Sequence, residues 1–143
     1  MPVILFAAAG VFLCMAGANA MVFGLFFPYL IADRLPAEVL LDQAAVGGAA
    51  VALGVAFAVL GLAHLATAVA LSRGARVAET CGIVLGAGMA LLAFGLAVAL
   101  LVSVVAASAP TAVLLPPAVI MGLAAVAYGA ATAGILRGRN GPI

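Results

Sequence analysis

Few residues in this chain are suited to chemistry, and most of them lie inside long apolar segments. Polar groups placed in hydrocarbon are costly, so each is a candidate for function by default. His64 is the strongest candidate, because Gly61 and Ala68 put it on a face of small residues that should pack against another helix. Polar side chains within the apolar segments include Asn19, His64, Thr67, Thr80, Tyr128 and Thr132.

His64 is expected to share a layer with two other reactive side chains. Counting about 1.5 Å per residue from the expected cytoplasmic helix ends places His64, Tyr128 and Cys14 at similar depth, with Gly86 near the same level. The simplest interpretation is a neutral His64 that hydrogen-bonds to Tyr128, to Thr67 or to a backbone carbonyl.

Three other roles for His64 each lack a component. A haem iron needs a second axial ligand, which another chain would have to supply. A proton relay needs an acid at the same depth, and none is present. A metal bound by His64 and Cys14 has too few ligands for ordinary affinity.

The sequence predicts no enzyme active site. It contains no phosphate-binding glycine motif, no paired carboxylates, no cysteine pair at metal-binding spacing and no Ser-His-Asp set. We therefore predict no catalytic residue, no cofactor and no metal. Cys14 and Cys81 lie in apolar segments, where a free cysteine usually behaves as a small hydrophobe. Asn19 lies on a different face from Gly10–Gly24 and is expected to hydrogen-bond between helices.

Composition identifies the elements that must position these residues. Of 143 residues, 69% are hydrophobic and 6% charged, against about 45–50% and about 25% in soluble domains, so lipid must be the main solvent. A net charge of +1 gives no indication of nucleic-acid binding. Long apolar runs without alternation indicate helices. The predicted spans are residues 3–32, 43–72, 77–107 and 117–136.

The predicted fold is therefore an all-α membrane protein, with residues 1–143 forming a single integral membrane domain. Four transmembrane helices would form an up-down-up-down bundle with short connections. Residues 3–15 have the length of a signal-peptide core, but no Lys or Arg precedes them and the apolar run continues to Ile31. We interpret this segment as a retained first helix.

Arginines between the spans predict orientation. Both termini and loop 73–76 should be cytoplasmic, and the acidic segment 33–42 should lie outside, where Arg34 is the only arginine. The cytoplasmic arginines are Arg73 and Arg76 in the loop, and Arg137 and Arg139 in the C-terminal segment 137–143.

Three local features accompany this topology. Segment 35–42 reads either as a short interfacial helix or as an extension of the second span. Glu79 is expected to pair with Arg76 in the first turn of the third span. Gly74 is well placed to end the second helix.

Helices in lipid associate where small residues let their backbones approach. Glycines recur every seven residues in the first two spans, a period that favours a left-handed crossing. The predicted packing glycines are Gly10, Gly17, Gly24, Gly47, Gly54, Gly61, Gly82, Gly86, Gly122 and Gly129.

Three functions fit these features. The first is a structural or accessory subunit whose partners are the bilayer and other membrane subunits, or copies of itself. The second is a small homo-oligomeric transporter or channel with His64 in the path, and the third is a haem-binding electron carrier. Abundant Ala, Gly and Val with no Lys suggest a bacterial genome, and hence an inner membrane.

Overall fold

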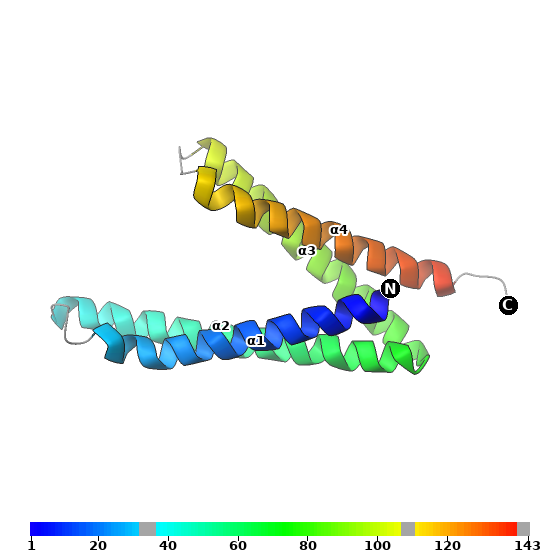
Figure 1. The fold of residues 1–143 in the computed structure, drawn as a ribbon, viewed down its shortest axis with the longest axis horizontal. Coiled ribbons are helices and arrows are strands. Elements are labelled where there is room, and N and C mark those ends of the chain that lie inside the picture. The colour runs from blue at the N-terminus through cyan, green and yellow to red at the C-terminus, as the bar shows by residue number, and fades with distance from the viewer. Residues whose placement is uncertain (32–36, 107–110, 140–143) are drawn as a thin grey trace. The chain divides into compact units, whose positions relative to one another are not determined.

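The chain is all-helical wherever its elements are defined. The computed structural model describes the backbone of residues 1–31, 37–106 and 111–139, and the side chains of residues 1–26, 45–105 and 114–138. These residues form four α-helices (Figure 1). They are α1 (Pro2–Ile31), α2 (Ala37–Ser72), α3 (Arg76–Ala106) and α4 (Thr111–Arg139).

Each helix contains a segment long and apolar enough to cross a bilayer. These segments are Pro2–Phe26, Ala45–Ser72, Arg76–Val105 and Leu114–Gly138. The part of the chain that the structure describes therefore carries the helices of a multi-pass membrane protein. Large apolar side chains are exposed on all four helices.

Two helices begin earlier than the predicted spans. α2 begins at Ala37 and continues unbroken through residue 43, which matches an extension of the second span rather than a separate helix. α4 begins at Thr111, so Pro116 and Pro117 lie in its second turn. Both prolines lie beyond the first four residues of α4, so each one removes the hydrogen bond that an N–H would donate to the carbonyl four residues earlier.

The chain divides into two compact units. One is Phe6–Ala66 and the other combines Met1–Leu5 with Thr67–Ile143. The first contains most of α1 and α2, and the second contains α3, α4 and the end of α2. That these units form one integral membrane domain stays a prediction.

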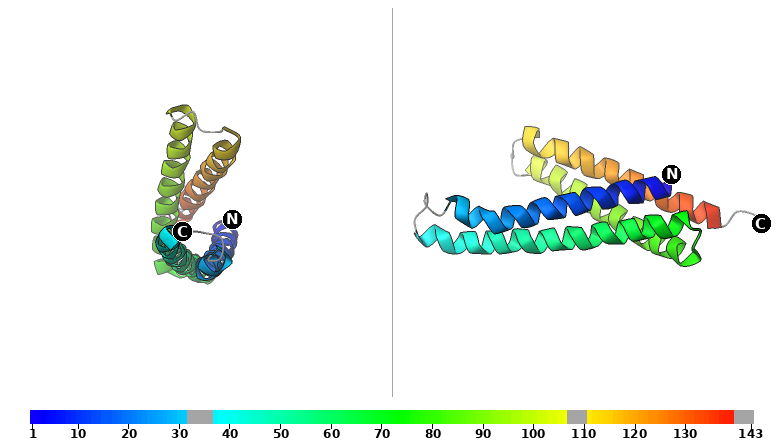
Figure 2. Two further views of the ribbon diagram at one scale, coloured as in Figure 1. Left: turned by 90° about the vertical axis from the view of Figure 1, so that its left-hand side faces the viewer. Right: turned by 60° about the horizontal axis from the view of Figure 1, so that its bottom comes forward.

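α1 and α2 run antiparallel and side by side (Figures 1 and 2). Gly10 lies against Gly61, Gly17 against Gly54, and Gly24 against Gly47. The two residue numbers in every pair add up to 71, so each step of seven residues along α1 is matched by seven along α2. The heptad spacing thus sets the register of this hairpin.

The turn between α2 and α3 is set by Gly74. Its φ of 69° is left-handed, a conformation that side chains with a Cβ resist. The Gly74 N–H donates to the Leu71 carbonyl at 3.1 Å, and the Ala75 N–H donates to the Ala70 carbonyl at 3.2 Å. These two bonds make a Schellman motif, and the predicted role of Gly74 is confirmed.

α3 and α4 form the second hairpin, and they pack side by side (Figure 2). Gly82 of α3 lies near the base of this hairpin, where a Cβ would be 3.0 Å from Ile135 Cδ1 on α4 and 3.5 Å from Leu71 Cδ1 on α2. The last turn of α2 therefore belongs to the packing of this unit. At the same end, Gly134 lies 3.8 Å from Pro2 by the same measure.

Candidate functional site

The α1–α2 seam is a backbone-to-backbone contact. A Cβ built on Gly17 would lie 2.6 Å from the Gly54 carbonyl oxygen, and one built on Gly54 would lie 2.7 Å from the Gly17 carbonyl oxygen. A Cβ on Gly24 would come within 2.5 Å of the Gly47 carbonyl oxygen. No side chain fits at these distances, and Cα–H groups can instead face carbonyl oxygens.

His64 lies one helical turn beyond the last glycine pair of this seam. The register that pairs Gly10 with Gly61 also brings Phe6 to His64, and their ring centroids are 5.5 Å apart with an interplanar angle of 40°. Both side chains are 0% exposed. The imidazole therefore fills space inside the protein instead of facing lipid.

The hydrogen bonding of His64 fixes its tautomer. Nδ1 lies 2.7 Å from the Leu60 carbonyl oxygen, one turn earlier in α2. A carbonyl oxygen only accepts, so Nδ1 must carry the hydrogen and, in the neutral ring, Nε2 must carry the lone pair. Sequence reasoning anticipated a backbone carbonyl among the partners, although it did not identify Leu60 or Phe6.

Cys14 occupies the space that Gly61 leaves open. A Cβ on Gly61 would lie 2.6 Å from Cys14 Sγ. The half-buried thiol is 3.9 Å from the Ala58 carbonyl oxygen, which is a weak hydrogen bond. Cys14 and His64 therefore both adjoin the seam near Gly61, in the same unit.

Tyr128, the third member of the predicted layer, belongs to the other unit. Its side chain is buried, and its carbonyl accepts a 2.8 Å hydrogen bond from Thr132 Oγ1. Gly86 is also buried in that unit. The meeting of Tyr128 with His64 and Cys14 stays a prediction. Among the described residues, no group of three or more His, Cys, Asp or Glu side chains is arranged to hold a metal ion.

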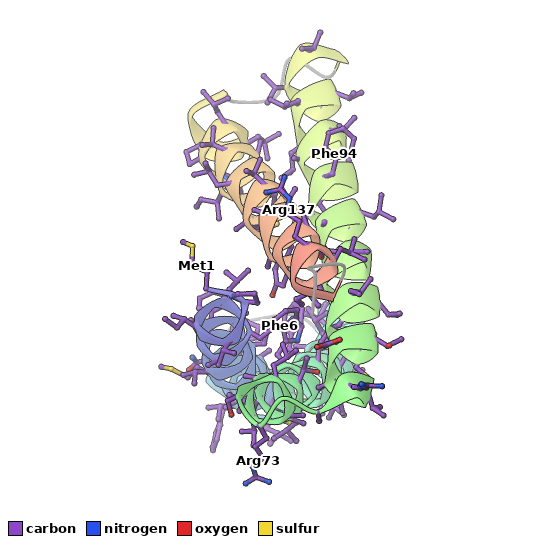
Figure 3. The ribbon with its side chains drawn as sticks, turned by 90° about the vertical axis from the view of Figure 1, so that its right-hand side faces the viewer. Met1, Phe6, Arg73, Phe94 and Arg137 are labelled. Carbon is purple, nitrogen blue, oxygen red and sulfur yellow. The ribbon has the colours of Figure 1, made fainter. Side chains whose placement is uncertain are left out.

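The basic side chains lie at helix ends. Arg73, Arg76 and Arg137 are exposed, and Arg73 extends away from the turn that joins α2 and α3 (Figure 3). The side chain of Arg139 lies outside the described residues. Within the described part of the chain, Arg76 and Glu79 do not form the expected ion pair. Both side chains are near a helix end, where water can solvate them.

Several glycines outside the α1–α2 seam have open space beside them. In the described part of the α3–α4 unit, no atom lies within 4 Å of a Cβ built on Gly122 or Gly129, although both are predicted packing positions. The same is true of Gly88 and Gly95 on α3, a second pair at seven-residue spacing. The sequence prediction did not include Gly88 and Gly95. It used the G-x-x-x-G pattern of Gly82 and Gly86, which lies on another face of α3.

Asn19 differs from the other polar side chains in the spans. It is exposed on α1 and makes no hydrogen bond to any residue in the described ranges. The expected interhelical hydrogen bond is therefore absent among the described residues of its own unit, and a bond to α3 or α4 stays a prediction.

No family model matches the sequence, and no curated protein or solved structure is similar to it.

Proposed function

We propose that this chain is a non-enzymatic membrane protein that serves as a structural or accessory subunit of a larger membrane complex. In this proposal its four helices cross a bacterial inner membrane in an up-down-up-down bundle, and both termini are cytoplasmic. The observation that carries the proposal is the set of open glycines on α3 and α4.

Glycine inside a helix is destabilising by roughly 0.5–1 kcal/mol relative to alanine. We therefore expect helical glycines mainly where the backbone of a neighbouring helix must come close. The glycines of the α1–α2 seam meet that need inside the chain. Among the described residues of their own unit, no atom lies within 4 Å of a Cβ built on Gly88 or Gly95 of α3, or on Gly122 or Gly129 of α4. The seven-residue spacing within each pair gives each of the two helices a strip without side chains, which favours a partner helix in the membrane.

The polar inventory supports a subunit role over a chemical one. Among the described residues, His64 donates to its own helix, as do Thr132 and Ser103. Side chains engaged in this way stabilise the local backbone and do not line a path for a polar substrate. What the chain offers in quantity is packing surface.

The test is purification of the tagged, full-length chain in a mild detergent, followed by native mass measurement. We expect a complex of fixed stoichiometry with another membrane subunit. Gly95→Leu and Gly122→Leu should each release the partner, because the new side chain fills the strip.

Gly48→Leu is the matched control, since Gly48 is also open but lies on α2 outside the seven-residue pairs. It should leave the complex intact. Purification of the unchanged chain without any partner subunit would refute the proposal, as would a complex that withstands both substitutions on α3 and α4.

A further inference from the structure

Asn19 is a polar side chain in the middle of a span that makes no hydrogen bond to the described residues of its own unit. Inside the spans, the other described polar groups either bond to the backbone or make a further interaction, as Thr67 and Tyr128 do. The described polar groups without such a bond, Asn19 excepted, lie at the α2–α3 end or at the end of α4, where headgroups and water are within reach. They are Arg73, Arg76, Glu79, Thr80, Cys81 and Arg137.

Asn19 points away from the hairpin that contains it. Gly17 faces α2, and two residues turn a helix by about 200°, so Asn19 lies about 160° around α1 from the seam. Its side chain is exposed. Among the described residues of its own unit the amide therefore has no hydrogen-bond partner, and it faces away from α2.

Asn19 also lies too deep to reach water. α1 continues to Ile31 without a charged residue, so Asn19 lies twelve residues, or about 18 Å, before the end of the helix. An asparagine side chain has a single methylene and cannot snorkel that far, unlike Lys or Arg. In lipid the amide would keep both its donors and its acceptor unsatisfied.

The surface around Asn19 has the pattern of a helix–helix seam. Its members follow one another at intervals of three and four residues, which is the a/d spacing of a heptad, and the four apolar members are 55–70% exposed. They are Phe12, Met15, Asn19, Val22 and Phe26.

We infer that this surface, the Asn19 face of α1, binds the Asn19 face of a second copy of the chain in a parallel, symmetric dimer. A second copy inserted with the same topology has its own Asn19 at the same depth. An amide carries both donors and an acceptor, so two copies related by a two-fold axis satisfy each other with a pair of N–H···O bonds. A single asparagine in an apolar seam is a known way to fix helix register and oligomeric state. The inference depends on the membrane placement proposed above.

The first experiment measures association in vesicles of phosphatidylcholine and phosphatidylglycerol. Full-length copies with C-terminal fluorescent tags are followed by energy transfer as the lipid-to-protein ratio rises. We expect a dimer that Asn19→Ala weakens about tenfold, the effect of losing one to two intramembrane hydrogen bonds. Asn19→Gln keeps the amide and should retain most of the association. Ser103→Ala should change nothing, because that hydroxyl bonds to Ala99 in its own helix.

The second experiment maps the face by disulfide formation, in a chain carrying Cys14→Ala and Cys81→Ala. Met15→Cys and Val22→Cys should each cross-link two copies under membrane-permeant copper phenanthroline. Leu25→Cys is the control, because Leu25 is 59% exposed and lies about 120° around the helix from Asn19. It should not cross-link. This map holds even where an Asn19 variant fails to accumulate.

The outcomes separate this inference from the proposed function. A chain that does not remain with vesicles on flotation refutes the membrane placement itself. A chain that floats with vesicles but stays monomeric refutes only the dimer. A dimer that Asn19→Ala leaves at full strength, or cross-linking at Leu25→Cys in preference to Met15→Cys, also overturns it.

Discussion

At the scale of the residue, His64 behaves as part of the packing of α1 against α2. It is fully buried, its ring lies beside Phe6, and Nδ1 donates to the Leu60 carbonyl. His64→Ala would leave a cavity that the rigid glycine seam cannot close. We expect a loss of about 2–4 kcal/mol in the free energy of unfolding, measured by thermal or denaturant unfolding in detergent.

Thr132→Ala serves as the comparison, because it removes only a bond between Thr132 and the backbone one turn earlier. Its cost should stay at about 1 kcal/mol or less. An equal effect of both substitutions would contradict a packing role for His64. The transporter hypothesis makes a different prediction, namely that His64→Ala abolishes flux in liposomes while the protein remains folded.

At the scale of the element, the seam and the turn both depend on particular glycines. A Cβ on Gly54 would lie 2.7 Å from the Gly17 carbonyl oxygen and 2.8 Å from the Met21 nitrogen. Both are backbone atoms, which cannot move without a shift of the whole helix. Gly54→Ala should therefore separate α1 from α2 locally and destabilise the protein by about 1–3 kcal/mol. Gly48→Ala should instead stabilise it by about 0.5–1 kcal/mol, because that site is open.

Gly74 tests a different constraint, because its surroundings are open and its backbone is left-handed. Gly74→Ala should destabilise the α2–α3 turn by about 1–2 kcal/mol. Substitution by alanine should thus lower the free energy of unfolding at Gly74 and raise it at Gly48. If both variants changed the free energy of unfolding in the same direction, the argument from the left-handed φ of Gly74 would be contradicted.

The number of helices and most of their ends can be predicted from the sequence. Apolar runs of this length define four helices, and arginines or turn residues mark most of their ends. The start of α4 is the exception, since Pro117 suggests a first turn while the helix begins at Thr111. Proline is compatible with several positions near a helix start, so composition alone leaves that boundary open.

The candidate site is less predictable because it depends on faces as well as depth. Counting residues gives similar depths for His64, Cys14 and Tyr128, yet it does not say which way each side chain points. The structure places His64 and Cys14 beside Gly61 in one unit, and Tyr128 in the other. The contact of Phe6 with His64 could not be predicted, because nothing in the sequence distinguishes Phe6 from the other apolar residues of the first span.

At the scale of the whole molecule, orientation is the property that the charges alone predict. Arg73 and Arg137 are exposed at helix ends, and the positive-inside rule predicts that their end of the protein faces the cytoplasm. A C-terminal green fluorescent protein should therefore fluoresce in bacteria, and a C-terminal alkaline phosphatase should be inactive.

Neutralising the bias should disturb this orientation. Changing the four arginines that are predicted to be cytoplasmic to glutamine would leave Arg34 as the only arginine, and the phosphatase fusion should gain activity as chains insert in both orientations. Glu79→Gln is the matched control, because acidic residues contribute little to topology. An active C-terminal phosphatase on the unchanged chain would contradict the assigned orientation. Two parallel copies in the Asn19 dimer would then still place their amides at equal depth, because inversion of both copies preserves their symmetry.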